Sequence, residues 1–398
     1  MKRILAAFDK CKDSLSAKEL CDLAEKVLAD RFSDCVVTKA PLTDGGEGFV
    51  DILSSAAKGK FQSVEIKNSI GEVTKGTIGI CEIENLPSAV STSLGLPSTG
   101  KLGIVEMAQA AGLADLPQAE RNPWKTSTFG VGEMLRAAKF LGVDAILLGI
   151  GGSSTNDLGM GALAALGVNF YVKGKTHIVN PFPCYWQDIE KIDFDQLVDL
   201  PPLFIACDVD NPLLGKNGAT ARYGPQKGLP AEEIELFEEK ITQLQQLLAS
   251  KFPKVYQAAE FQGSGAAGGI GYGLSLPYKV SLIPGFSLVS NWFGLSKLVE
   301  EADLILTGEG RFDETSLSGK GPFELLNLAN LKSTPSILLA GSIDFNKVHE
   351  VCKKFHECDL LQFGMNEWSL EKNLSLAEER FTDTLNQYPF LSLCQSGN

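Results

Sequence analysis

The chain contains no hydrophobic run long enough to cross a membrane. Of its 398 residues, 44% are hydrophobic and 21% are charged, and no uninterrupted apolar stretch approaches the roughly 18 residues that a spanning helix needs. The first residues, MKRILAAFDKCKDS, begin with two positive charges but become polar too early for a secretory signal. We therefore expect a cytoplasmic protein with no membrane partner.

Positive charge is also scarce. The chain has 36 lysines and arginines against 49 aspartates and glutamates, which gives a net charge of −13, and the basic residues are scattered. Most of such a surface would repel nucleic acid, so we expect no nucleic-acid partner. An anionic small substrate would need a locally basic pocket.

The cysteines and histidines form none of the familiar patterns. The nine cysteines are odd in number and include no CxxC pair, which argues against a disulfide framework and against the common zinc sites. Only three histidines are present, and none adjoins a nucleophile motif. This weakens any proposal of a Ser-His-Asp hydrolase.

Two widespread nucleotide-binding motifs are absent or incomplete. Gly319-Lys320 lacks the earlier glycine of a P-loop and is followed by another glycine. A literal GxGxxG occurs at 263–268, but no convincing strand precedes it and no acidic residue occurs from 261 to 299. Nicotinamide binding is therefore disfavoured, and helix packing or a phosphate contact suits these small residues better. A nicotinamide-dependent hydroxy-acid dehydrogenase is kept as an alternative function.

Strand-like and helix-like segments alternate along the chain. Ser16 and Glu19 form a capping box that predicts a helix ending near Arg31, and 232–249 has the pattern of an amphipathic surface helix. The alternation predicts α/β domains with mainly parallel sheets. The apolar strand candidates are 4–8, 36–40, 146–150, 203–207, 304–307 and 337–340.

The segment 145–157 reads AILLGI followed by GGSSTND, a buried strand leading into a loop without bulky side chains. Gly151 and Gly152 allow backbone N–H groups to approach an anion, and Ser153 can donate to oxygen. Asp157 can hold a cation or accept a proton. The alternative is an ordinary N-cap for the next helix.

Two further loops carry charged groups beside predicted strands. In 9–14, Lys12 and Ser14 precede a helix and suit a carboxylate or phosphate, while Asp9 can hold a hydroxyl group or magnesium. In 44–48, Asp44 and Glu47 flank two glycines, and such acids are costly to pack unless they face water, a cation or a ligand. A solvated turn and the helix dipole are the respective alternatives.

Asp208 and Asn211 follow the predicted strand at 203–207. The carboxyl end of a strand is where an α/β enzyme places a catalytic carboxylate or a magnesium ligand, although Asn-Pro here also reads as a turn.

The strand at 304–307 leads into a predicted glycine-bounded turn that carries Glu309 and Arg311, with Lys320 close behind. Cations and carboxylates in one place suit phosphoryl transfer. A structural Arg–Asp pair is the alternative.

Taken in order, these loops resemble those of the bacterial glycerate kinase family, single-chain enzymes that phosphorylate D-glycerate with ATP. Three positions depart from the family pattern: Asp13 replaces a glycine, Cys11 replaces a phenylalanine, and Leu158 stands where a glycine is usual. The matching segments span most of the chain: 9–17, 41–48, 120–123 with 126–133, 151–157, 208–213, 224–228, 265–269 and 307–313.

The resemblance implies two α/β domains with the active site in the cleft between them. Residues 1–68 and 285–398 would form a flavodoxin-like domain from both chain ends, and 69–284 an inserted domain with a mixed sheet. It further implies D-glycerate and ATP as substrates, Mg²⁺ as cofactor, and 2-phosphoglycerate as the favoured product. A non-catalytic sugar-acid sensor is the second alternative, because Asp13 adds negative charge beside Lys12.

Residue chemistry and position then suggest roles within this site. Asp208 is the preferred base or metal ligand, and its competitors are Asp44, Glu47, Asp157 and Glu309. Lys12 and Arg311 complete the catalytic set. Asp208 and Glu309 are the candidate metal ligands. The expected substrate contacts are Asp9, Ser14, Asp44, Glu47, Asn156 and Asn211. The expected nucleotide contacts are Gly151, Gly152, Ser153, Gly265, Gly268, Gly308, Glu309 and Lys320.

Overall fold

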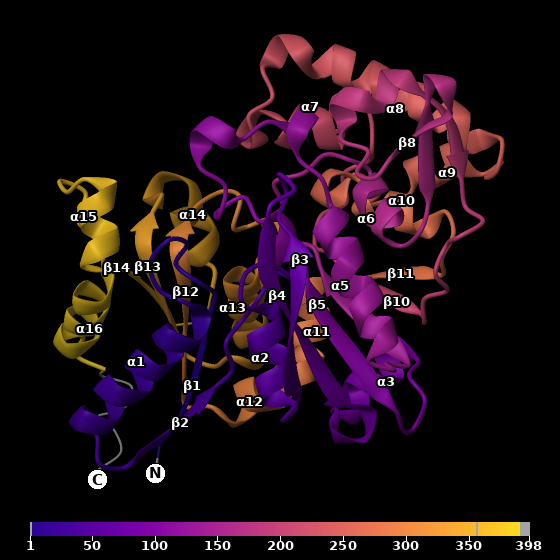
Figure 1. Cartoon of the computed structure of the whole chain (residues 1–398). Coiled ribbons are helices and arrows are strands. Elements are labelled where there is room, and N and C mark those ends of the chain that lie inside the picture. Colours follow the sequence, from indigo (N-terminus) through magenta and orange to yellow (C-terminus); the bar gives the residue numbers. More distant parts are fainter. Residues whose placement is uncertain (1, 356, 391–398) are drawn as a thin grey trace. The chain divides into compact units, whose positions relative to one another are not determined.

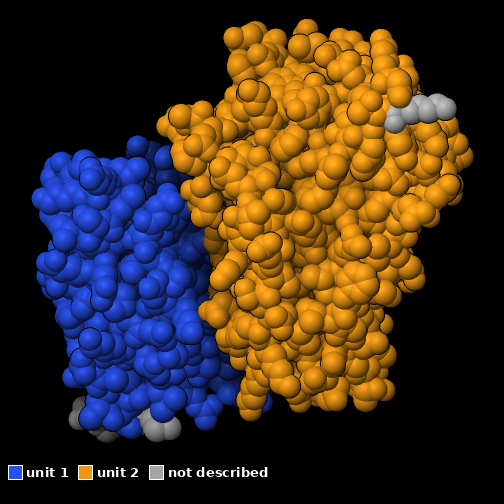
Figure 2. Space-filling model, in the orientation of Figure 1, with its two compact units in different colours: residues 1–44, 286–398 blue, residues 45–285 orange. Residues whose placement is uncertain are grey.

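The chain folds into two compact units in a computed structural model that describes residues 2–355 and 357–390. Unit 1 combines Met1–Asp44 with Phe286–Asn398, and unit 2 is Gly45–Gly285; Figure 2 colours them separately. The first crossing point thus falls after residue 44, whereas the sequence placed it after residue 68. The reason is that residues 60–67 pair with a strand of unit 2.

Unit 1 is built on a parallel sheet of five strands in the order β14-β13-β12-β1-β2. The strands are β1 (Lys2–Phe8), β2 (Cys35–Lys39), β12 (Leu304–Phe312), β13 (Ser336–Ile343) and β14 (Cys358–Gln362). Numbered within the unit, they run 5-4-3-1-2, which is the flavodoxin-like order with its switch point between the first and third strands. The predicted flavodoxin-like sheet made from both chain ends is confirmed.

Alternate residues of β1 pack on the two faces of this sheet, as a strand with both faces buried requires. Ile4 and Phe8 share a core with α1 (Ala17–Arg31) and α16 (Ala377–Gln387), whereas Leu5 shares a core with helices on the opposite face. Figure 1 shows α1 and α16 next to each other beside β1. The remaining helices of unit 1 are α11 (Gly285–Phe293), which starts at the unit boundary, α12 (Leu295–Glu301), α13 (Gly321–Lys332), α14 (Phe345–Cys352) and α15 (Leu370–Ser375).

The helix signals in the sequence are also confirmed. The Ser16 hydroxyl accepts a hydrogen bond from the Glu19 N–H, and the Glu19 carboxylate accepts one from the Ser16 N–H at 2.8 Å, so the capping box is complete. The amphipathic helix predicted at 232–249 is α8 (Ile234–Ala249), preceded by a short 3₁₀ turn.

Unit 2 contains a mixed six-stranded sheet in the order β11-β10-β6-β5-β4-β3 and a small antiparallel sheet, β8-β7-β9. In the large sheet β4 is antiparallel to both of its neighbours, and the other pairs are parallel. The strands are β3 (Lys60–Lys67), β4 (Val73–Glu82), β5 (Lys101–Glu106), β6 (Ala145–Gly149), β7 (Asn169–Val172), β8 (Thr176–Ile178), β9 (Ile189–Asp193), β10 (Leu203–Ala206) and β11 (Val280–Ile283). This mixed sheet agrees with the expectation from the family resemblance.

The helices of unit 2 are α2 (Phe49–Ala56), α3 (Ser88–Leu94), α4 (Ala108–Ala111), α5 (Phe129–Phe140), α6 (Met160–Ala165), α7 (Ala219–Tyr223), α8, α9 (Val255–Glu260) and α10 (Ile270–Ser275). No helix within 2–355 or 357–390 combines the length and apolarity needed to cross a membrane.

One local expectation is wrong. The sequence placed Glu309 and Arg311 in a turn, but β12 continues to Phe312, and these residues pair with Ala340 and Ser342 of β13. A side chain at Gly308 would collide with the Leu339 carbonyl group, so the glycine serves the close approach of two strands. Strand pairing therefore positions Glu309 rigidly.

Candidate functional site

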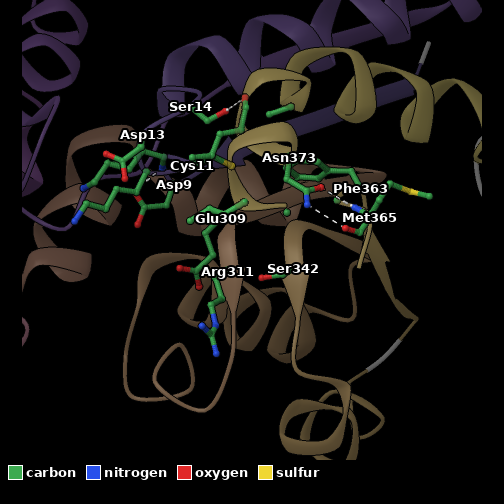
Figure 3. A pocket seen from close by; sticks show the side chains of 18 of the residues that line it. Asp9, Cys11, Asp13, Ser14, Glu309, Arg311, Ser342, Phe363, Met365 and Asn373 are labelled. Carbon is green, nitrogen blue, oxygen red and sulfur yellow. Dashed lines mark hydrogen bonds between the residues drawn. The ribbon is translucent and has the colours of Figure 1, made fainter. Parts of the chain in front are cut away.

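The carboxyl ends of the unit 1 strands surround a pocket of about 650 Å³. Asp9 follows β1 and Glu309 lies near the end of β12, so the two carboxylates flank the switch point at which α/β sheets of this order bind ligands. The Asp9 N–H extends the pairing of β1 by donating to the Gly308 carbonyl at 2.9 Å. Figure 3 shows Asp9 and Glu309 among the side chains that line the pocket.

Asp9 is 7% exposed and is surrounded by charge. Burial raises the pKa of its carboxyl group to about 7, the Lys10 ammonium opposes this rise, and the carboxylates of Asp44 and Glu309 add to it. Lys10 also bonds to Asp44 at 3.0 Å. A carboxyl group with a pKa near neutrality is suited to exchange a proton with a substrate.

Glu309 has one satisfied and one unsatisfied carboxylate oxygen. Its Oε2 contacts the Lys320 ammonium at 3.0 Å, whereas Oε1 is buried and has no hydrogen-bond partner among the described residues. Burial raises the pKa of Glu309, and Lys320 counteracts the rise. An unpaired buried carboxylate oxygen costs free energy unless a ligand or cation completes it.

The remaining charged groups of this edge are more open to solvent. Lys12 and Arg311 are exposed and line the pocket, and Arg311 pairs with Asp313 at 3.0 Å. The Ser14 hydroxyl donates to the Leu374 carbonyl at 3.2 Å, so it anchors α15. The predicted cations are therefore at the pocket, while Ser14 has a structural bond.

Asp157, a competitor of Asp208 for the role of base, is buried within unit 2. Asp157 is 1% exposed and accepts hydrogen bonds from the Thr128 N–H, the Thr128 hydroxyl, and the N–H groups of Gly159 and Gly161, at 2.7 to 3.2 Å. Burial raises the pKa of Asp157, and these bonds oppose the rise. Asp157 therefore links the start of α5 to the start of α6.

Lys227 is a buried charged residue beside this loop that the sequence did not single out. It is 3% exposed, and its ammonium group donates to the Ser153 hydroxyl at 2.9 Å and to the Thr155 carbonyl at 2.6 Å. Burial lowers the pKa of Lys227 to about 7, and the Asp157 carboxylate opposes the drop. The available signal was its place in the GPQKG segment at 224–228. Lys227 fixes the loop that follows β6.

Four buried polar atoms of unit 2 have no hydrogen-bond partner within the described part of the chain: Ser54 Oγ, Thr155 Oγ1, Asn156 Oδ1 and Asn211 Oδ1. The Asn156 amide nitrogen donates to the Thr220 hydroxyl at 2.9 Å, which orients this side chain. The predicted substrate contacts Asn156 and Asn211 thus keep free oxygen acceptors.

The glycines predicted to bind a nucleotide serve close packing in unit 2. A side chain at Gly265 would collide with the Pro212 carbonyl, and one at Gly268 would collide with the Thr155 carbonyl. The segment 263–268 follows α9, a helix, and not the strand that a dinucleotide fold requires. Close packing therefore accounts for Gly265 and Gly268, and their contact with a nucleotide stays a prediction.

The loop after β6 also approaches the 45–48 segment. The Gly151 N–H donates to the Gly45 carbonyl at 3.0 Å, and side chains at Gly151 and Gly152 would collide with Gly46 and Glu47 respectively. The structure therefore brings the predicted residues 47 and 151–157 together within unit 2.

Asp208 lies two residues beyond the end of β10 and is exposed. Its Oδ1 accepts a hydrogen bond from the Gly285 N–H at 2.6 Å. No group of three or more His, Cys, Asp or Glu side chains within the described ranges has the arrangement of a metal site.

The two departures from the family glycines fall at positions with a positive backbone φ. Asp13 has φ 61° and Leu158 has φ 56°, a region that glycine adopts without strain and other residues adopt rarely. Asp13 is exposed and Leu158 is fully buried. Both positions thus have a backbone conformation that favours glycine, although neither residue is one.

Comparison with known proteins points to one family. The model of the glycerate kinase family matches residues 4–388. A glycerate kinase of Bacillus cereus is 35% identical over 353 residues, which cover 87% of this chain and 88% of that protein. A protein of Escherichia coli named glycerate 2-kinase is 32% identical over 359 residues, with coverages of 87% and 88%.

A solved structure shares the whole fold. The crystal structure of a putative glycerate kinase 2 from Salmonella typhimurium matches with a TM-score of 0.74 and 32% sequence identity. The match covers 97% of this chain and 96% of that chain. The similarity therefore includes both units.

Proposed function

This chain belongs to the glycerate kinase family, and from that premise we propose that it transfers the γ-phosphoryl group of ATP to the 2-hydroxyl group of D-glycerate. Membership makes the chain an ATP-dependent phosphotransferase. The name of the Escherichia coli relative supports the 2-position. The proposed products are 2-phospho-D-glycerate and ADP.

The observation that carries the proposal is the pair of buried carboxyl groups at the switch point of unit 1. Asp9 and Glu309 lie beside the cations of Lys10, Lys12 and Lys320 in one pocket. Phosphoryl transfer requires little covalent chemistry from the protein, but it does require cations and carboxylates that hold the phosphate groups in line with the acceptor. This pocket combines the two.

Mg²⁺ is the cation that kinases commonly use with ATP. It prefers oxygen ligands and binds proteins through one or two carboxylates, while phosphates and water complete its shell. Glu309 Oε1, buried and without a partner among the described residues, fits that demand, and Asp9 is its carboxylate neighbour. We therefore assign the holding of Mg²⁺ to Glu309, where the ion would neutralise phosphate charge.

Lys12 is the proposed contact of the glycerate carboxylate, because it is an exposed cation on the pocket wall. Proton acceptance from the 2-hydroxyl group has two candidates. Asp208 is the candidate from the sequence, and Asp9 is the candidate from its raised pKa. If Asp208 is the base, Asp208→Asn lowers kcat by about 10²–10⁴-fold. A kcat near that of the wild type would leave Asp9 as the remaining candidate for the base.

The decisive experiment supplies purified enzyme with ATP, Mg²⁺ and D-glycerate, and follows the carbon-13 shifts of the product. We expect the signal of carbon 2 to move on phosphorylation, together with equal release of ADP. A shift at carbon 3 would contradict the 2-position, and absence of glycerate-dependent ADP release would contradict the kinase proposal itself.

A further inference from the structure

The unit 1 pocket has two chemically different sides, which Figure 3 shows face to face. One side carries the charged residues Asp9, Asp13 and Glu309. The other side carries apolar and aromatic residues from the segment after β14, including Phe363 and Met365. A three-carbon acid such as glycerate is small and polar throughout, so it has no apolar group that could pack against the apolar side.

The apolar side is a rigid, hydrogen-bonded loop. The amide nitrogen of Asn373 donates to the carbonyl groups of Met365, Trp368 and Ser369 at 3.0 to 3.3 Å, and its oxygen accepts from the Met365 N–H at 2.8 Å. The Phe363 carbonyl accepts from Arg380 Nε at 3.2 Å. Because these backbone groups are bonded internally, the loop can present apolar side chains to a ligand without exposing unpaired polar atoms.

Leu370 completes this surface and is unusually open. It lines the pocket and is 74% exposed. Trp368, which also lines the pocket, has the Lys372 ammonium 4.0 Å from its ring centroid. Aromatic and apolar side chains around a cavity of this volume are typical of sites for ligands with a flat, partly apolar ring.

The charged side offers the complementary chemistry. Lys320 precedes α13 as its N-cap, at the positive end of the helix dipole, and pairs with Glu309 at 3.0 Å. Phosphate groups bind at such positions when a lysine and a helix N-terminus coincide. The pocket is therefore apolar at one side and suited to phosphate at the other.

We propose that this pocket binds a purine nucleotide in one orientation, with the base against Met365, Trp368 and Leu370 and the phosphate groups toward Lys320. The inference rests on the proposed kinase function. It assigns contact with the base to residues 363–374, which the sequence did not select, and it keeps Lys320 among the expected nucleotide contacts. The base-binding surface then lies entirely on the loop after β14 and on α15.

The test compares Leu370→Glu with Leu331→Glu as a matched control. Leu331 is a leucine of α13 that is 79% exposed and does not line the pocket. Calorimetry measures the dissociation constants of ADP and of inorganic tripolyphosphate, both without glycerate. We expect Leu370→Glu to weaken ADP binding about tenfold through loss of apolar contact, with tripolyphosphate binding and the control unchanged.

Trp368→Ala is the second variant, since stacking of a base on an aromatic ring is worth about tenfold or more in affinity. ADP affinity unchanged in both variants would overturn the inference, and so would equal losses for ADP and tripolyphosphate. A rise in KM for glycerate with KM for ATP unchanged would also overturn it.

The same measurements separate this inference from the proposed function. If Leu370→Glu selectively weakens ADP binding but the wild-type enzyme releases no ADP with glycerate, the base site stands and the glycerate kinase function fails. If glycerate is phosphorylated and neither variant changes nucleotide affinity, the function stands and the base site fails.

Discussion

The carboxyl edge of the unit 1 sheet and the loop after β6 in unit 2 both combine an aspartate with a lysine, Asp9 with Lys10 and Asp157 with Lys227. In unit 1 the carboxyl groups line an open pocket, and Glu309 Oε1 lacks a partner among the described residues. In unit 2 Asp157 accepts four hydrogen bonds and Lys227 donates two.

The difference separates a charged group that is open to a ligand from a charged group whose hydrogen bonds are complete. A charged group whose bonds are all made within its own unit stabilises that unit, because any ligand would have to displace a bond already formed. A buried group with an open lone pair is stabilised only when a ligand arrives. We therefore expect substitutions in unit 1 to act on catalysis and substitutions at Asp157 and Lys227 to act on stability.

The largest expected effect concerns catalysis at the unit 1 edge. Glu309→Gln should lower kcat strongly, because it removes the carboxylate assigned to Mg²⁺. If Asp9 is the base, Asp9→Asn should lower kcat by about 10²–10⁴-fold. Both substitutions keep the size of the side chain, so the urea midpoint should change little. Glu314→Gln is the matched control, since Glu314 has a side chain 73% exposed and pairs with Lys347. If steady-state kinetics gave Glu309→Gln the same kcat as the control, the expected role of the unit 1 carboxylates in catalysis would be wrong.

The next effect concerns the stability of unit 2. Asp157→Ala leaves the donors of Thr128, Gly159 and Gly161 without their acceptor and removes the carboxylate near Lys227. We expect a loss of about 3–5 kcal/mol in the free energy of unfolding. The control is the exposed Asp188, whose replacement by alanine should change stability by less than about 0.5 kcal/mol. Equal urea midpoints for the two variants would show that Asp157 does not stabilise unit 2 by linking α5 to α6.

The third prediction uses the pH dependence of Lys227. Its pKa is about 7 in the folded protein against an ordinary value of 10.5, so between these values the unfolded chain binds a proton that the folded chain lacks. Stability therefore rises with pH across this window and is lost as pH falls toward 7. Compared with Lys227→Met, the wild type should gain about 2 kcal/mol from about pH 7 to pH 9.

Urea denaturation at several pH values measures this difference. Cysteines and tyrosines that ionise in the same range are common to both proteins, so their contributions cancel in the comparison. Parallel stability curves for the wild type and Lys227→Met would show that Lys227 is not held neutral by burial.

The smallest effects concern the two residues that replace family glycines at positive φ. Leu158→Gly removes a fully buried side chain, and we expect it to cost about 2 kcal/mol even though backbone strain is relieved. Asp13→Gly removes an exposed side chain at φ 61° and should stabilise by about 0.5 kcal/mol. Thermal unfolding measures both changes: we expect Leu158→Gly to lower the stability and Asp13→Gly to raise it. A loss of stability in Asp13→Gly would contradict the argument that its backbone is strained.

Local signals explain which parts of the fold could be predicted. The apolar runs that became β1, β6, β10 and β13, and the capping box of Ser16 and Glu19, depend on neighbouring residues alone. The continuation of β12 through Glu309 to Phe312 was missed, because glycines and charges in sequence resemble a turn. Pairing with β13, a segment more than twenty residues away, stabilises it as a strand.

The candidate site was predictable as residue chemistry and less so as geometry. The sequence selected Asp9, Lys12 and Glu309, which the structure brings to one pocket. It did not select Lys227 or the segment around Phe363. Neither has a local sequence pattern that distinguishes it from an ordinary turn, so the burial of Lys227 and the position of the other segment at the pocket could not be predicted. Asp157 was selected for a chemical role, which stays a prediction; the sequence did not show that it accepts four hydrogen bonds.

The sequence by itself determined the class of this protein: an α/β kinase of the glycerate kinase family, without a P-loop and without a dinucleotide fingerprint. Those properties follow from residue types at short spacing. Tertiary structure alone decided which charged groups are open to a ligand, because burial and hydrogen-bond satisfaction depend on strands and helices that are distant in the chain. For that reason Glu309, which has an open carboxylate oxygen, and Asp157, whose hydrogen bonds are complete, differ in structure although both are acidic residues in glycine-rich segments of the sequence.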